Sequence, residues 1–388
     1  MAIRPADHGV IGQVGLAETG QGYFCGGHYG ATKYTYVNRL AFGNETTTSG
    51  ANTMTGGGYG TSGCSNNGVA GYIALGSADT ADVDKLTFGT EAVATLSTGL
   101  SLARYGTAAF ANSGTAGYFG GGVTASYRAE TDKYAFSDDS RTTLAAGLDP
   151  SRGMGGGFAN GSTAGYICGG FTGSASLVVN KWAFSDDSRS TLGTGLSEAC
   201  YWVSGCANGT TAGYSNLGTA NTTSVDKFSF SDDSRSILTS TLNDVSYPAG
   251  ASDNGVAAYF GGGYSGALST SVRKIAYSDD SSSTLAATFA NYRGAAAGLA
   301  NSAARWNSAT PSSNSSSRAP ATSWNISSSA STTRPRCSST NACWNSSPNS
   351  TSTAWQTSLD AGCCWRWNDS AGQTIRWTPW TPKKSRQN

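Results

Sequence analysis

Residues 117–144, GYFGGGVTASYRAETDKYAFSDDSRTTL, decide the fold of this chain because both of their motifs recur along the sequence. One is a Gly-Tyr pair that opens a short apolar run with glycines, and the other is an Asp-Lys strand followed by Ser-Asp-Asp-Ser. The tyrosine motif returns every 45 to 49 residues. A period of this length fits one four-stranded blade of a β-propeller. The six repeated tyrosines are Tyr23, Tyr72, Tyr118, Tyr166, Tyr214 and Tyr259.

Each repeat has the pattern of short strands joined by tight turns. In DKYAF, residues 132–136, apolar and polar side chains alternate, which is typical of a strand with one buried face. The Ser-Asp-Asp-Ser that follows favours a turn, because Asp and Ser side chains bond the backbone two residues on. With no helical pattern in residues 1–300, the predicted fold class is all-β. Dipeptides that favour tight hairpins are Asn67-Gly68, Asn160-Gly161, Asn208-Gly209 and Asn254-Gly255.

The repeat resembles the kelch class of β-propeller over residues 20–300. The resemblance depends on glycine pairs followed by an aromatic strand. It departs from the kelch pattern at Gly76 and Gly218, where the pair is reduced to one glycine, and the regular kelch Trp is found only at Trp182. The near-identity of neighbouring repeats and their Ala, Gly, Ser and Thr content are similar to the propeller repeats of tailed-phage virion proteins. The glycine pairs are Gly26-Gly27, Gly120-Gly121, Gly169-Gly170 and Gly261-Gly262.

The propeller is predicted to occupy residues 1–300, with repeats that start near residues 22, 71, 117, 165, 213 and 258. We expect a kelch-like β-propeller of six or seven four-stranded blades. Residues 11–20, IGQVGLAETG, resemble the segment that precedes a Gly-Tyr strand and duplicate residues 294–302. This duplication favours seven blades, one of them built from both ends of the propeller.

Residues 301–388 are an irregular Ser/Thr/Trp-rich C-terminal extension. They contain no Tyr, Phe or Val, but they hold eight of the ten Trp residues. Two interpretations are open. In one, the tryptophans dock the extension on the propeller or on a partner. In the other, the segment is an out-of-frame translation of further repeats, since Gly-Gly codons read one base off give Trp, and the break falls where the next Gly-Tyr strand would follow.

Charge and composition argue against several classes of function. Lys plus Arg number 25 and Asp plus Glu 24, a balance that argues against a nucleic-acid partner. Charged residues are only 13% of the chain, against about 25% in a typical soluble protein. No apolar stretch is long enough for membrane insertion, and the first residues show no signal peptide. An exterior type of surface without an export signal favours a virion protein, extracellular after host lysis.

No catalytic, metal or cofactor site is predicted. The two histidines, His8 and His28, lack partners at metal-site spacing, and the nine cysteines include no CxxC pair. Cys25 and Cys168 occupy equivalent strand positions and are interpreted as small buried residues. We therefore expect a protein that is not an enzyme, with a sugar-acting enzyme on a kelch propeller as the minor alternative.

Two repeated charged motifs are interpreted as structural. The Asp pairs, such as Asp138-Asp139, lie one to a repeat and too far apart to share a Ca²⁺ ion, so they are predicted to cap turns. The Asp-Lys pairs, such as Asp132-Lys133, favour solvated strand ends over ion pairs with a neighbouring blade.

The segment between the glycine pair and the Asp-Lys strand varies most between repeats, and variable loops on a constant frame are the usual place for recognition. Aromatic side chains there can stack on sugar rings. The phage resemblance implies a non-enzymatic tail-fibre or decoration component that binds host-surface glycan or another virion protein, as an oligomer within an assembly. A non-viral protein-interaction scaffold is the alternative. The candidate binding residues are Tyr29, Tyr34, Tyr36, Tyr127, Arg128, Phe171 and Tyr264.

Overall fold

The computed structural model divides the chain into two compact units, Met1–Pro311 and Ser312–Asn388. It describes residues 20–302, apart from residues 30, 77–79, 219–223, 240–241, 243–245, 265–266 and 292–293. In the second unit it describes two short strands, β27 (Trp367–Asn368) and β28 (Thr374–Ile375), which pair antiparallel. Both interpretations of the extension concern residues that lie almost wholly outside the described part of the chain.

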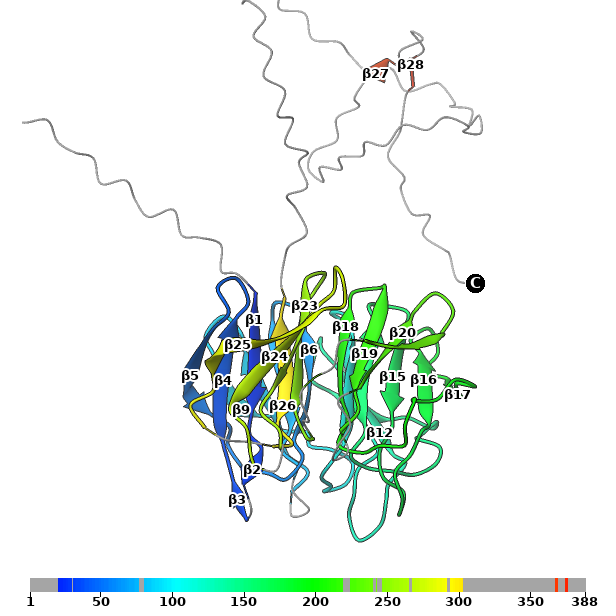
Figure 1. Cartoon of the computed structure of the whole chain (residues 1–388). Coiled ribbons are helices and arrows are strands. Elements are labelled where there is room, and N and C mark those ends of the chain that lie inside the picture. Colours follow the sequence, from blue (N-terminus) through cyan, green and yellow to red (C-terminus); the bar gives the residue numbers. More distant parts are fainter. Residues whose placement is uncertain are drawn as a thin grey trace, which may run out of the picture. The chain divides into compact units, whose positions relative to one another are not determined.

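Six four-stranded antiparallel sheets form the blades of a propeller (Figure 1). The described residues contain no helix. In each sheet the inner strand contacts the inner strands of both neighbouring sheets, so the six inner strands surround a central channel. From the inner strand outward, blade 1 consists of β26 (Ala297–Asn301), β1 (Gln21–Cys25), β4 (Tyr36–Ala41) and β5 (Thr46–Thr53), and blade 2 of β6 (Ser62–Asn66), β7 (Ala70–Ala74), β8 (Val83–Thr87) and β9 (Ala92–Thr95). Blade 3 consists of β10 (Ala108–Asn112), β11 (Ala116–Gly120), β12 (Thr131–Ala135) and β13 (Arg141–Thr143), and blade 4 of β14 (Gly156–Asn160), β15 (Ala164–Cys168), β16 (Val179–Ala183) and β17 (Arg189–Thr191). Blade 5 consists of β18 (Ser204–Asn208), β19 (Ala212–Asn216), β20 (Val225–Ser229) and β21 (Arg235–Ile237), and blade 6 of β22 (Ala249–Asp253), β23 (Ala257–Gly261), β24 (Ser271–Ala276) and β25 (Ser282–Thr288).

The ring is closed in blade 1 by strands from the two ends of the described propeller. β26 pairs with β1 in antiparallel register, from Gln21 opposite Asn301 to Cys25 opposite Ala297. The expectation of seven blades is therefore wrong, and the count is six. The physical reason is that residues 297–301 already fill the inner-strand position beside β1, so the N-terminal copy of this segment implies no seventh blade.

Neighbouring blades cover one another face to face. The Gly-Tyr strand is therefore buried along its whole length in blades 2 to 6, as in β11, and in blade 1 it is buried apart from the half-buried Gln21. Between blades 3 and 4, Phe110 stacks on Tyr118 with ring centroids 4.8 Å apart and packs against Trp182 at 5.6 Å. Glycines allow the inner strands to approach backbone to backbone. A Cβ at Gly157 would lie 2.1 Å from the Ala109 carbonyl oxygen of the preceding blade.

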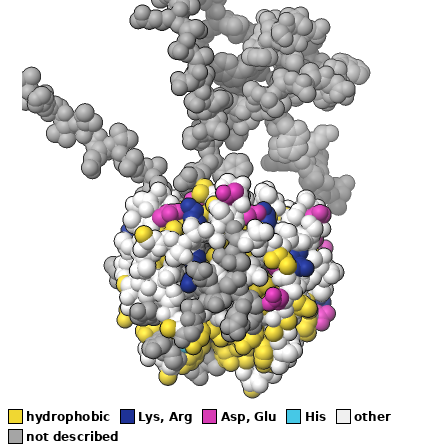
Figure 2. Space-filling model, in the orientation of Figure 1, with side chains coloured by type: hydrophobic (Ala, Val, Ile, Leu, Met, Phe, Trp, Pro, Cys, Tyr) yellow, Lys and Arg dark blue, Asp and Glu magenta, His cyan; other side chains and the backbone are white. Residues whose placement is uncertain are grey.

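The strand order places two kinds of connection at opposite ends of the ring. The Asn-Gly hairpins and the Asp-Asp turns lie at one end, which we call the turn end. The loops from the second to the third strand, and from the outer strand to the next inner strand, lie at the other, which we call the loop end. In Figure 2, hydrophobic side chains gather at the loop end, the lower end of the view, while most of the visible charged side chains lie toward the turn end and the flank.

A repeated contact joins each blade to the next. The second Asp of an Asp pair accepts hydrogen bonds from the repeat tyrosine and from the lysine of the preceding blade. At Asp187 these come from Tyr118 Oη (2.8 Å) and Lys133 Nζ (2.6 Å). We call this set of tyrosine, cation and acid a latch. The other five latches are Tyr72, Lys85 and Asp139; Tyr166, Lys181 and Asp233; Tyr214, Lys227 and Asp280; Tyr259, Lys274 and Glu45; and Tyr23, Arg39 and Glu91.

The latches revise the interpretation of both charged motifs. The lysines of the Asp-Lys pairs were expected at solvated strand ends, and this is wrong, because Lys133 forms an ion pair with Asp187 of the next blade. The turn interpretation of the Asp pairs holds for the first member: Asp138 Oδ1 accepts a hydrogen bond from the Ser140 amide (3.1 Å). The second member, such as Asp187, instead has a left-handed backbone (φ 56°) that directs its carboxylate toward the preceding blade.

Candidate binding site at the loop end

Six residues at equivalent positions surround the loop end of the central channel, which we call the channel mouth. Each lies just before an inner strand and has a left-handed backbone, with φ between 53° and 65°. The six, which we call the mouth ring, are Gly60, Gly106, Met154, Trp202, Tyr247 and Ala295.

Backbone hydrogen bonds between blades hold the mouth ring. Left-handed φ is unfavourable for residues with a Cβ, by about 1–2 kcal/mol each, and such outliers persist where surrounding contacts over-determine them. Here the contacts are amide-to-carbonyl bonds that pass from blade to blade. They are Gly106 N to Gly60 O (3.1 Å), Met154 N to Gly106 O (2.6 Å), Trp202 N to Met154 O (2.6 Å), Ala295 N to Tyr247 O (2.8 Å) and Thr61 N to Ala295 O (3.1 Å).

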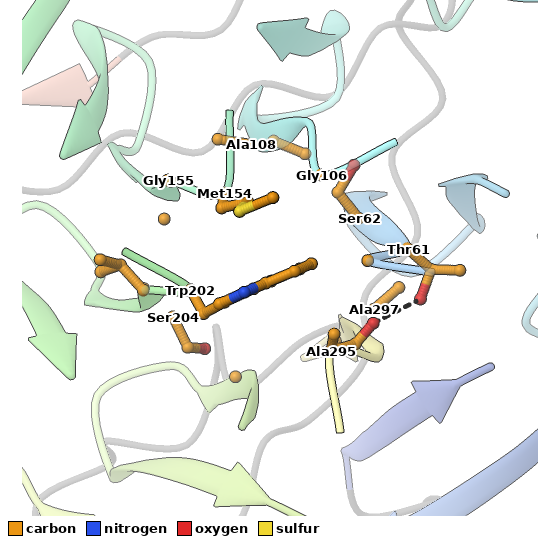
Figure 3. Close-up of a pocket in the computed structure, with 18 of the residues that line it drawn as sticks. Thr61, Ser62, Gly106, Ala108, Met154, Gly155, Trp202, Ser204, Ala295 and Ala297 are labelled. Carbon is orange, nitrogen blue, oxygen red and sulfur yellow. Dashed lines mark hydrogen bonds between the residues drawn. The ribbon is translucent and has the colours of Figure 1, made fainter. Parts of the chain in front are cut away.

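A hollow of about 100 Å³ lies inside the mouth ring. None of the described residues that line it is Asp, Glu, Lys, Arg or His. The polar groups are hydroxyls and backbone: the hydroxyls of Ser62 and Thr107 share a hydrogen bond (2.5 Å), and the Thr61 hydroxyl donates to the Ala295 carbonyl (3.3 Å). Figure 3 shows the Trp202 indole reaching across this hollow, with Met154 on one side of it.

Three of the residues predicted to form a contact surface, Tyr127, Phe171 and Tyr264, belong to loops at the loop end, and the first two are in contact. Tyr127 contacts Phe171 (ring centroids 5.7 Å apart), and Phe171 contacts Tyr201 (4.9 Å). On the other side of the mouth, Tyr264 lies 6.5 Å from Tyr247 and is 42% exposed. Residues from blades 3, 4 and 6 thus contribute to one aromatic end of the molecule.

Three further candidates belong to blade 1. Tyr34 stacks on Tyr36 with centroids 5.5 Å apart, and Tyr36 is 42% exposed. Tyr29 lies in β2 (His28–Tyr29), which pairs with β3 (Thr32–Lys33), but its side chain lies outside the described part of the structure.

Arg128 is committed to a neighbour within its own loop. Its guanidinium donates to the Glu130 carboxylate. Burial alone would raise the pKa of Glu130, but the hydrogen bonds and charge of Arg128 outweigh it and lower that pKa below its usual value. Arg128 therefore orders the loop that carries Tyr127, and its charge is neutralised before any ligand arrives.

Several residues of this end were missed from the sequence. Trp202, Tyr247 and Met154 lie in the loops between an outer strand and the next inner strand, whereas the search covered only the loops after the glycine pairs. Trp202 and Tyr247 contact each other edge to face at 5.3 Å. A signal was present, because each member of the mouth ring lies six residues before the Asn or Asp that ends the inner strand.

The described residues offer little for catalysis. No group of three or more His, Cys, Asp or Glu side chains within them is arranged to hold a metal ion. The thiols of Cys64, Cys168 and Cys206 are buried, and burial raises the pKa of Cys64 and of Cys206 to about 12. Nor does the described part of the chain contain a helix long and apolar enough to cross a bilayer.

Comparison with known proteins adds no assignment. Neither a scan against protein-family models nor a search of curated proteins finds a match to this chain. Any function must therefore be argued from the geometry of the loop end and from the sequence repeats.

Proposed function

We propose that this chain is a non-enzymatic recognition propeller that binds glycan through its loop end. The observation that carries the proposal is the gathering of aromatic side chains from separate variable loops around one uncharged hollow. Tyr and Trp supply rigid apolar faces with a polar tip, so they bind ligands that combine C–H faces with hydroxyls. Sugars have this chemistry.

The turn end suits a different role. The second acid of each turn pairs with a cation in a latch, the first, such as Asp138, caps its own turn, and the end carries exposed aliphatic residues such as Val69 (54% exposed) in place of aromatic ones. We therefore assign different roles to the two ends. The latches stabilise the ring, and the side chains of the loop end can vary between repeats without disturbing the latches.

The setting we propose is the virion of a tailed phage, where the chain serves as a tail-fibre or decoration protein on host-surface glycan. Support comes from the kelch-like and phage-like style of the repeats and from the low content of charged residues, 13% of the chain. A protein-interaction scaffold is the second candidate. It is favoured by exposed apolar groups at the loop end, such as Leu177 (45%), since Tyr, Trp and other apolar residues are common in interface cores.

A glycan array with two matched variants tests the proposal. The first variant replaces Tyr127, Phe171 and Tyr264 by Ala at the loop end, and the control replaces Val69 and Val256 by Ala at the turn end. We expect glycan binding by the wild type and the control, with loss of binding in the loop-end variant at an unchanged melting temperature. Equal binding by all three proteins would reject the loop end as the site, and absence of glycan binding by the wild type would reject glycan as the ligand.

A further inference from the structure

The Trp202 side chain occupies an unusual position in the channel mouth. It belongs to blade 5, and a Cβ placed on Gly60 of blade 2 would lie 2.6 Å from its Cζ3 atom and 2.7 Å from Cη2. Blades 2 and 5 are opposite each other in the ring of six. The indole therefore spans the mouth, and it fits there because the opposite member of the mouth ring has no side chain.

The backbone at Trp202 does not require this side chain. All six members of the mouth ring have left-handed φ, yet Ala295 and Gly106 have the same backbone with almost no side chain. The inter-blade hydrogen bonds explain the conformation, but they do not explain a large, partly exposed indole at one of the six positions. Strained positions that carry bulky residues cluster at ligand sites.

The walls around the indole define which ligands can enter. The hollow holds about 100 Å³, a volume that limits it to one small ring and excludes a chain of them. The hydroxyls of Ser62 and Thr107 bond each other and retain lone pairs for a ligand hydroxyl. Among the described lining residues the only ionisable group is the Tyr247 phenol, so these walls offer a charged ligand no counter-charge for the water it would lose.

We infer that the hollow is a subsite for a single uncharged sugar ring, with the Trp202 indole as its stacking platform. The inference rests on the proposed function, glycan binding, and adds to it the residue that holds the terminal sugar and the exclusion of acidic sugars. Tyr127, Phe171 and Tyr264 then form an outer rim that contacts the rest of the glycan.

The test measures binding of monosaccharides by ligand-observed NMR. The probes are methyl glycosides of galactose, glucose and N-acetylglucosamine, compared with N-acetylneuraminic acid and glucuronic acid. Trp202→Ala is expected to weaken binding of the best neutral sugar on the order of tenfold, and Trp202→Phe by less, in line with about 0.5–1.5 kcal/mol for a ring contact. Gly60→Ala, which displaces the indole without removing it, is expected to weaken binding as well. Since Ala295 has the same backbone, Ala at position 202 is compatible with the fold.

Each outcome has a separate meaning. Loss of neutral-sugar binding in Trp202→Ala at an unchanged melting temperature, and in Gly60→Ala at a melting temperature lowered only by the strain of its left-handed backbone, supports the subsite. Unchanged binding in Trp202→Ala together with loss in the rim variant would overturn the subsite and leave the proposed function standing. Acidic sugars bound as tightly as neutral ones would also overturn it. A wild type that binds no sugar would overturn both proposals.

Discussion

At the residue scale, the repeat motifs are parts of one device. Tyr118, Lys133 and Asp187 come from three separate sequence signals, and the structure brings their polar atoms within 2.8 Å across a blade interface. The same set of tyrosine, cation and acid recurs at each of the six interfaces between blades. The effect on stability of changing one latch is therefore expected to apply to the others. Two residue-scale predictions follow from how these groups are buried.

Alkaline pH is expected to destabilise the ring through the latch tyrosines. Burial, with the hydrogen bond to the partner acid, raises the pKa of Tyr72, Tyr118, Tyr166 and Tyr214 well above the usual value of 10.0. The folded state keeps these protons when the unfolded chain has lost them, so the free energy of unfolding is highest below pH 10 and falls above it. The slope is at most about 1.4 kcal/mol per pH unit for each tyrosine.

Chemical denaturation at a series of alkaline pH values measures this effect. Tyr118→Phe is the matched variant, because it removes one titrating hydroxyl and is expected to flatten the slope. A free energy of unfolding that stays constant from about pH 9 to about pH 11 would contradict the prediction.

A second residue-scale prediction concerns the buried pair of Asp132 and Arg104, which are both fully buried and 2.9 Å apart. Burial would raise the pKa of Asp132, but hydrogen bonds from Thr143 and Ser101 and the charge of Arg104 lower it below 3.8. In blade 4 the equivalent pair is Arg152 with the uncharged Asn180 in place of the acid. The Arg152 guanidinium donates a hydrogen bond to Asn180 Oδ1 (2.8 Å).

Asp132→Ala leaves the Arg104 guanidinium buried without a counter-charge and is expected to cost about 3–5 kcal/mol of stability. Asp132→Asn is expected to cost much less, because blade 4 already accommodates this arrangement. The stability that comes from the carboxylate is present above about pH 4 and is lost as the pH falls, so Asp132→Asn also reduces acid sensitivity. Denaturant unfolding at neutral and acid pH gives both quantities; equal losses for the two substitutions would refute the assignment.

At the element scale, the inner strands determine how tightly the ring closes. Their second position is small in every blade: Gly63, Ala109, Gly157, Gly205, Gly250 and Gly298. At Gly157 and Gly298 an added Cβ would lie 2.1 Å and 1.9 Å from a carbonyl oxygen of the neighbouring inner strand. A side chain there must push two backbones apart, and neither can move without breaking its ladder.

Gly157→Ala is therefore expected to destabilise the protein by about 1–3 kcal/mol, as overpacking does. Gly193→Ala is the control, since an added Cβ there meets nothing within 4 Å, and it is expected to change stability by less than about 0.5 kcal/mol. Thermal melting of both variants compares them directly. A Gly157→Ala protein as stable as the control would mean that the inner strands are not packed as described.

At the scale of the whole molecule, closure depends on β26. This strand comes from the far end of the propeller sequence and forms a five-residue ladder with β1. It also contacts the inner strands of blades 2 and 6. The composition of the chain changes at residue 301, where β26 ends, so the repeats stop where the ring is complete.

A chain shortened to end at residue 302 is expected to keep its strand content and cooperative unfolding. One that ends at residue 296 loses β26, exposes the edge of β1 and is expected to aggregate or to melt far lower, because an open edge strand templates pairing with other chains. Circular dichroism and size-exclusion chromatography compare the two. Equal behaviour would show that β26 is not needed for closure.

The repeat, the all-β class and the four strands of each blade could be predicted from the sequence, because hydrophobic alternation and turn residues act over a few neighbouring positions. It also indicated variable loops with Tyr127, Phe171 and Tyr264 as a contact surface, and that assignment remains a proposal. Only the tertiary structure decided the count of six, since β26 and the N-terminal copy of its sequence both match the inner-strand pattern. It alone showed the latches and the mouth ring with Trp202, because these depend on contacts between residues from 45 to more than 200 positions apart, such as Lys274 and Glu45.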